Sequence, residues 1–129
     1  MKYLLDVNAL IALGLHQHQA HPRVTRWIDL QQDLLLLTCS ITELGFVRII
    51  SNPSVYGFTL DQARNQLLDV KRTPSLFTFI EDANDVTHLP DWVRLSAQTT
   101  DGHLLTLAQS HDAQLATLDA RLPGAFLIP

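Results

Sequence analysis

The stretch KYLLDVNALIALGL, residues 2–15, decides the fold, because it joins a buried strand to a buried helix through one charged residue. Residues 2–5 form a short, largely apolar run that stops at Asp6, which is typical of a strand covered on both faces. Residues 8–15 are apolar at nearly every position, which predicts a buried helix. A strand that leads directly into a helix is the repeating unit of an α/β sheet.

The same order recurs along the chain. Residues 34–39 (LLLLTC) predict a second strand covered on both faces, and the helix that follows it from Ser40 ends before Asn52-Pro53, since the residue before a proline avoids the helical region. Helices are also predicted at residues 22–32, at 60–70 with Thr59 as the cap, and after Asp101; strands are predicted at 76–80, 114–118 and 125–128. Alternating strands and helices predict a three-layer α/β/α domain with a central, mostly parallel sheet.

Composition sets the broad class of the protein. The chain has 129 residues, 47% of them apolar and 17% charged, so we expect one domain that spans residues 1–129. No membrane-spanning or targeting segment is expected, and the single cysteine, Cys39, cannot form an internal disulfide, which fits the cytoplasm. The net charge of −4 excludes a broadly basic surface for polyanions. Any nucleic acid must therefore be held locally.

Four carboxylates lie where a strand ends or a helix begins. Asp6 and Asp119 follow predicted strands, whereas Glu43 and Asp101 lie in the first turns of predicted helices. The carboxyl ends of parallel strands and the amino ends of the following helices share one edge of an open sheet, so these side chains can meet there. Four carboxylates in one crevice would repel one another without a cation. The pattern favours metal-dependent phosphodiester chemistry.

Each carboxylate also has a structural interpretation. Ser40-Ile41-Thr42-Glu43 matches a capping box, in which Glu43 would reach back to the start of its own helix. Asp101 lies in a first helical turn, where the helix dipole favours a negative charge. Asp6, which Asn8 follows closely, and Asp119 could be ordinary turn residues, because aspartate and asparagine are common in turns. Asp6 and Asp119 are the strongest candidates, because neither matches a helix cap. Asn8 could orient a ligating carboxylate or a bound water.

Four short motifs together resemble the PIN-domain ribonucleases, specifically toxins of the VapC type. Residues 4–10 (LLDVNAL) resemble the opening strand of that family, and residues 42–48 (TELGFVR), 100–105 (TDGHLL) and 115–119 (LATLD) resemble its later motifs, in the same order. The likeness spans nearly the whole chain. It implies that Asp6, Glu43, Asp101 and Asp119 form an acidic site assisted by Asn8 and Thr117. Gly102 stands where the family commonly has alanine.

The resemblance also implies a chemistry and partners. Carboxylates favour Mg²⁺, with Mn²⁺ as the alternative, and Asp6, Asp101, Asp119 and Glu43 would be the ligands. The implied activity is hydrolysis of RNA by a metal-activated water, with tRNA as one candidate substrate. The implied partners are a VapB-type antitoxin, whose short basic segment could enter the acidic crevice, and a second copy of the chain in a homodimer.

Other interpretations remain open at this stage. The same fold could serve as a catalytically weak RNA-binding or regulatory module, and a carboxylate-based phosphatase or phosphoacceptor is a third class. The third class is the weakest, because a phosphatase that uses an aspartate nucleophile would need a second acid where Asn8 stands. Arg48 and Arg121 follow acidic motifs and are the favoured phosphate contacts. His16 and His18 are predicted to belong to a polar loop without a metal.

Overall fold

The computed structural model describes residues 1–73 and 75–129, and in these ranges five strands form one sheet. The strands are β1 Lys2–Leu5, β2 Leu35–Thr38, β3 Phe77–Phe79, β4 Gln114–Thr117 and β5 Phe126–Leu127. Their order across the sheet is β3-β2-β1-β4-β5, and every neighbouring pair is parallel. The sheet is therefore fully parallel in the described residues, where the sequence predicted a mostly parallel one.

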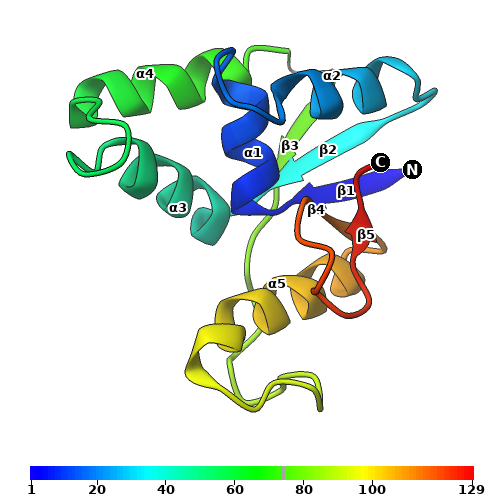
Figure 1. The fold of residues 1–129 in the computed structure, drawn as a ribbon. Coiled ribbons are helices and arrows are strands. Elements are labelled where there is room, and N and C mark those ends of the chain that lie inside the picture. The colour runs from blue at the N-terminus through cyan, green and yellow to red at the C-terminus, as the bar shows by residue number, and fades with distance from the viewer. Residues whose placement is uncertain (74) are drawn as a thin grey trace.

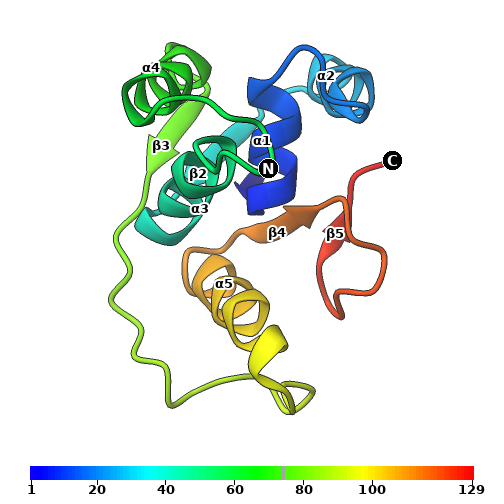
Figure 2. The ribbon, with the colours of Figure 1, turned by 60° about the vertical axis from the view of Figure 1, so that its left-hand side comes forward.

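Helices cover both faces of this sheet. They are α1 Val7–Gly14, α2 His21–Asp29, α3 Ser40–Ile50, α4 Leu60–Val70 and α5 Thr99–Ser110, with a 3-10 turn at Ser96–Gln98. Figures 1 and 2 show α1 to α4 on one side of the sheet and α5 on the other. The predicted three-layer α/β/α architecture is confirmed.

Side chains alternate between the two cores along each strand. Tyr3 and Leu5 of β1 pack into the core under α1 to α4, whereas Leu4 packs with Leu104 of α5 on the other face. Successive side chains of a strand point to opposite faces, so a strand buried on both sides must be apolar throughout. This is the physical reason for the continuous apolar runs in the sequence.

The predicted elements are present, with ends that shift by a few residues. The helix at residues 60–70 matches its prediction, and the Thr59 hydroxyl caps it by accepting a hydrogen bond from the Gln62 amide at 3.1 Å. The helix predicted at residues 22–32 begins at His21 and ends at Asp29, and β5 is two residues shorter than predicted. None of the helices in the described ranges is long and apolar enough to cross a membrane.

Gly102 allows a loop to pack closely against α5. A Cβ atom at this position would lie 2.4 Å from Cγ2 of Val93 and 3.2 Å from Cδ of Pro90. The segment at residues 90–93 therefore occupies the space of the alanine methyl group that the family resemblance leads one to expect at this position.

We expect Gly102→Ala to lower the stability of the protein by about 1 kcal/mol. Alanine gains about 1 kcal/mol of helix propensity, but overpacking against Val93 costs about 1–3 kcal/mol. The check is the midpoint of thermal unfolding, measured also for Gly102→Ala in a Val93→Ala background. In that background alanine is expected to stabilise the chain. Stabilisation in the wild-type background would contradict this explanation.

Candidate active site

Three of the four predicted carboxylates line one cavity at the carboxyl edge of the sheet. Asp6 follows β1, Asp119 lies just beyond the neighbouring β4, and Asp101 lies in the first turn of α5. Together with Asn8 they line a cavity of about 410 Å³. The pairing of β1 with β4 brings together residues that are more than a hundred positions apart in the sequence. This is the arrangement that parallel sheets commonly use for binding sites.

Thr117 links the polar groups of this cavity. Its buried hydroxyl donates to Oδ2 of Asp6 at 2.8 Å and accepts from the amide of Asn8 at 3.2 Å and from the backbone N–H of Asp119 at 3.1 Å. The Asn8 amide oxygen in turn accepts from the backbone N–H of Leu118 at 3.1 Å. One threonine at the end of β4 therefore fixes both aspartates and the asparagine.

Asp6 also caps α1. Its Oδ1 accepts a hydrogen bond from the backbone N–H of Val7 at 2.8 Å, although its side chain is only 6% exposed. The prediction that no capping role explains Asp6 is therefore wrong. A carboxylate at a helix N-terminus is stabilised by the exposed amides there, so the cap also keeps the charged form available inside a largely buried site.

The carboxylates of the cavity affect one another's protonation. Burial raises the pKa of Asp6, an effect that the Thr117 and Val7 hydrogen bonds oppose and the Asp119 charge reinforces. Burial also raises the pKa of Asp101, with the charges of Asp6 and Asp119 adding to the effect. Hydrogen bonds from Arg121 lower the pKa of Asp119. Two of the three carboxylates are thus destabilised in their charged form, and a bound cation would relieve this.

We expect Asp101→Asn to change how stability depends on pH. A raised pKa means that the folded chain holds the proton more tightly than the unfolded chain, so stability falls as pH rises from the ordinary aspartate value of 3.8 through the raised value. In Asp101→Asn this carboxyl group is absent, so stability should decrease less as pH rises. Urea unfolding of wild type and variant in chelator at several pH values checks this. A constant difference in unfolding free energy across that range would contradict it.

Glu43 is directed elsewhere. Its carboxylate accepts a hydrogen bond from the Thr38 hydroxyl at 2.6 Å and pairs with Lys71 at the end of α4, and it is not among the residues that line the acidic cavity. The capping-box interpretation is wrong as well. The cap is Cys39, whose backbone N–H donates to the Thr42 hydroxyl, because α3 begins one residue earlier than the motif requires.

The donor set fits a hard cation held partly through water. Within the described ranges, no group of three or more carboxylate, imidazole or thiol side chains is placed to hold a metal ion. Asp6, Asp101, Asp119 and Asn8 nevertheless line one cavity. Mg²⁺ is commonly held by one or two carboxylates and several waters rather than by a closed protein cage, and this set of oxygen donors suits that mode.

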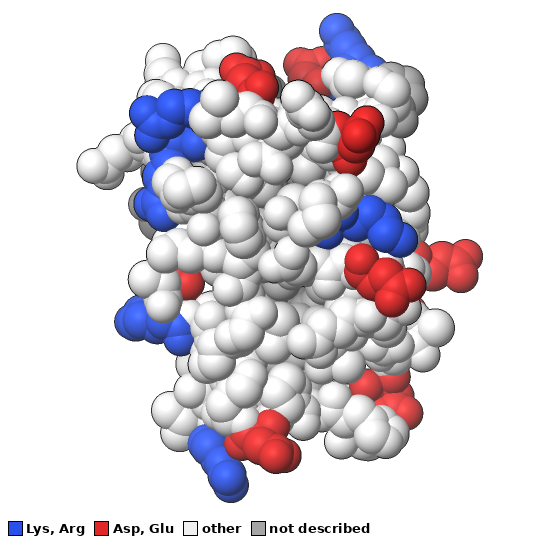
Figure 3. Space-filling model, turned by 90° about the vertical axis from the view of Figure 1, so that its right-hand side faces the viewer, with Lys and Arg blue, Asp and Glu red and all other residues white. Residues whose placement is uncertain are grey.

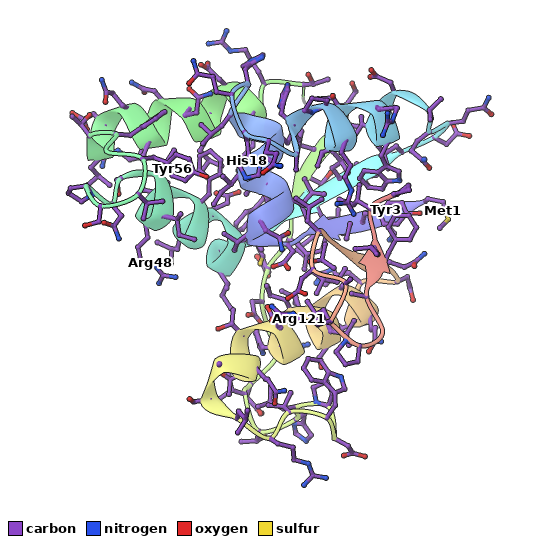
Figure 4. All side chains as sticks on the ribbon, in the orientation of Figure 1. Met1, Tyr3, His18, Arg48, Tyr56 and Arg121 are labelled. Atoms are coloured by element: carbon purple, nitrogen blue, oxygen red, sulfur yellow. The ribbon has the colours of Figure 1, made fainter. Side chains whose placement is uncertain are left out.

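The two favoured arginines differ in position. Arg121 pairs with Asp119 through its Nε at 3.1 Å and lines an adjoining cavity of about 370 Å³ with Asp101 and Asp119. Arg48 is exposed on α3 and does not line either cavity (Figure 4). On the face drawn in Figure 3, basic side chains are scattered among acidic ones, without a continuous basic patch.

His18 and Tyr56 also line the acidic cavity, and the sequence did not predict them as site residues. His18 belongs to the loop between α1 and α2, whereas Tyr56 belongs to the loop between α3 and α4. Figure 4 shows the two side chains near each other. No sequence motif marks either residue. Their position depends on how α1 packs against α3, which only the tertiary structure shows.

Comparison with known proteins identifies relatives over most of the chain. Residues 3–125 match the family model described as PIN domain. Ribonuclease VapC38 of Mycobacterium tuberculosis is 40% identical over 121 residues, which cover 91% of this chain and 84% of that protein. Ribonuclease VapC29 of the same organism is 36% identical over 142 aligned positions, which cover 100% of this chain and 98% of that protein.

Solved structures show the same fold at lower sequence identity. The crystal structure of M. tuberculosis VapC20, described as a toxin that cleaves the sarcin-ricin loop, matches with a TM-score of 0.64 at 11% identity and covers 93% of this chain and 92% of that one. PAE2754 from Pyrobaculum aerophilum matches with a TM-score of 0.57 at 23% identity and covers 99% and 84%, respectively. These two structures support the fold assignment.

Proposed function

Because the chain belongs to the VapC-type PIN-domain family, we propose that it is an endoribonuclease toxin of a toxin-antitoxin system, which hydrolyses RNA phosphodiester bonds with the help of Mg²⁺. The observation that carries the proposal is the cavity lined by Asp6, Asp101 and Asp119, in which Thr117 bonds to the carboxylate of Asp6 and to the backbone N–H of Asp119. The curated relatives are named ribonucleases, which supports RNA as the substrate class.

The residues of the cavity have distinct roles in this mechanism. Asp6, Asp101 and Asp119 would hold the ion. Thr117 orients the Asp6 carboxylate and holds the backbone of Asp119, and Asn8 supports Thr117 through its own hydrogen bond. When bound, Mg²⁺ would lower the pKa of a water that attacks the scissile phosphate and would stabilise the charge that develops there. Burial of Asp6 excludes competing water from that carboxylate and fixes its orientation. The chain itself supplies the oxygen ligands and their geometry.

The RNA substrate, the antitoxin and the second copy of the chain are part of the same proposal. We propose that the substrate is single-stranded or loop RNA, with tRNA as one candidate, since unpaired bases are the usual targets of specific RNA recognition. A VapB-type antitoxin would neutralise the acidic cavity with a basic segment, and two copies of the chain would form a homodimer in the cytoplasm. Mn²⁺ would be able to replace Mg²⁺.

A catalytically weak RNA-binding module is the second candidate, and one observation favours it. Two of the four predicted carboxylates already pair with cations of the chain itself, Glu43 with Lys71 and Asp119 with Arg121. An ion would have to compete with these pairs. Exposed pairs such as Asp119 with Arg121 contribute only about 0–1 kcal/mol, so that competition is weak at Asp119.

The two candidates are separated by an RNA cleavage assay on the purified chain. Single-stranded RNA and total tRNA are incubated with Mg²⁺, with Mn²⁺, or with chelator, and the products are resolved on a gel. We expect cleavage with either metal and none with chelator, and the Asp119→Asn variant serves as the inactive control. Equal cleavage in chelator, or by the variant, would exclude the metal-dependent site. Binding of RNA without cleavage would favour the second candidate.

We expect Lys71→Met to lower the Mg²⁺ concentration needed for half-maximal cleavage several-fold. The family resemblance implies that Glu43 is a fourth ligand, but in the structure its carboxylate pairs with Lys71. Methionine keeps most of the aliphatic length of lysine but releases Glu43 from the pair. Titration of activity against Mg²⁺ measures the effect, with Glu43→Gln as the matched control. If Glu43→Gln cleaves RNA as well as wild type, Glu43 is structural and is not a ligand.

A further inference from the structure

A second cavity, of about 440 Å³, lies directly beside the acidic one. His18 and Tyr56 line both cavities, so the two adjoin at these side chains. The second cavity, hereafter the side pocket, is lined by Leu15, His16, Gln17, His18, Tyr56, Phe58 and Gln66. An RNA strand whose phosphate lies in the acidic cavity can therefore reach the side pocket.

The chemistry of the side pocket fits a nucleobase. Among the residues that the structure describes, its lining contains no aspartate, glutamate, lysine or arginine; it combines the apolar Leu15 and Phe58 with the aromatic ring of Tyr56 and the amide of Gln66. A wall without an ammonium or guanidinium group has no fixed positive charge to hold a phosphate, whereas a flat base can stack on an aromatic ring and bond its edge to an amide. We infer that the side pocket binds one unstacked base of the RNA, next to the scissile phosphate. This inference rests on the proposed ribonuclease function.

Tyr56 is held in place before any ligand arrives. The carbonyl oxygen of Asn52 accepts hydrogen bonds from the backbone N–H groups of Val55, Tyr56 and Gly57 at 3.0–3.2 Å. Gly57 has a φ of 73°, a left-handed conformation that glycine adopts at little cost, and the chain then returns to α3 through a bond from Phe58 N–H to Ile50 O. Tyr56 is nevertheless 41% exposed and lines the side pocket, so a base can reach it.

His18 and Gln66 offer directed polar groups. The backbone N–H of Ala20 donates to Nδ1 of His18 at 3.0 Å, so in the neutral ring the proton lies on Nε2, which can donate to the ribose or phosphate between the two cavities. Nε2 of Gln66 donates to the carbonyl of Gly14, which fixes the amide and leaves its oxygen and second N–H for a base edge. The pocket thus combines a stacking ring with hydrogen-bonding groups.

The test combines Tyr56→Ala with removal of the base from the RNA. A single-stranded RNA that wild type cleaves is made with one abasic nucleotide at each position around the cut in turn. Because a base that stacks on an aromatic ring binds more tightly, we expect Tyr56→Ala to raise KM about 10-fold with little change in kcat. One abasic position should raise the KM of wild type by a similar factor and should leave the KM of Tyr56→Ala almost unchanged. Tyr56→Phe should stay within about 2-fold of wild type.

Two outcomes would overturn the inference. One is an abasic scan in which no abasic position raises KM more for wild type than for Tyr56→Ala. The other is a Tyr56→Phe variant as impaired as Tyr56→Ala, which would assign the effect to the hydroxyl rather than to the ring. Because Tyr56 lies on an exposed loop, its replacement is not expected to unfold the chain, and thermal unfolding of each variant verifies this.

A binding measurement separates this inference from the proposed function. Fluorescence anisotropy compares labelled A₁₂, U₁₂ and fully abasic 12-mers on the chain with Asp119→Asn, with and without Tyr56→Ala. If wild type cleaves no RNA but base-dependent binding still requires Tyr56, the result supports base binding in the side pocket and contradicts the nuclease proposal. If wild type cleaves RNA while Tyr56→Ala binds all 12-mers as before, only the pocket assignment falls.

Discussion

Asp6→Asn is expected to reduce the rate of RNA cleavage by about 10³-fold. Asp6 is the most deeply buried of the three carboxylates in the cavity, and asparagine removes its charge with almost no change of shape. The loss of a charged ligand that stabilises charge in the transition state costs several kcal/mol, and each 1.36 kcal/mol is a factor of about ten. The measurement is the single-turnover rate at saturating Mg²⁺.

The same substitution should not weaken the fold. The oxygen of asparagine can keep the bond from the Val7 amide, and the Thr117 hydroxyl, which loses its bond to Asp6, can turn to the oxygen of Asn8 at 3.5 Å. Since burial raises the pKa of Asp6, its removal also relieves an unfavourable charge at neutral pH. We therefore expect Asp6→Asn to unfold at an equal or higher temperature than wild type in chelator. Full activity with unchanged stability would exclude Asp6 from the catalytic site.

Thr117→Val is expected to damage both stability and activity. The hydroxyl is 1% exposed and bonds to the Asp6 carboxylate, the Asn8 amide and the Asp119 backbone, and valine has the same shape without a donor or acceptor. Leaving such groups unpaired inside the protein costs about 2–3 kcal/mol, which corresponds to a fall of roughly 10 °C in Tm. Because Thr117 orients two proposed ligands, cleavage should fall about 10–100-fold.

Thr117→Ser is the matched control for this prediction. Serine keeps the hydroxyl and loses only a buried methyl group, worth about 1 kcal/mol, so its cleavage rate should stay close to that of wild type. The pH dependence gives a second readout. The Thr117 bond lowers the pKa of Asp6, so in Thr117→Val the loss of stability with rising pH should extend to higher pH. Equal activity of the valine and serine variants would show that the hydroxyl does not position the site.

The sequence alone predicted the layers of the fold and the approximate ends of its elements. Runs such as residues 2–5 and 34–39 are apolar throughout because both faces of a parallel strand are buried, and this local pattern is readable without a structure. It also predicted which acidic residues follow strands or open helices. For Asp6, Asp101 and Asp119 the edge of the sheet does bring the side chains to one cavity.

Only the tertiary structure decided where the remaining side chains point and which loops complete the cavity. Glu43 follows the expected motif, yet it contacts Thr38 and Lys71, because α4 packs beside α3 and brings a cation to it. His18 and Tyr56 carry no motif and reach the cavity through the packing of α1 on α3. Periodicity and capping depend on near neighbours in the chain, whereas these contacts join distant segments, so no local pattern could reveal them.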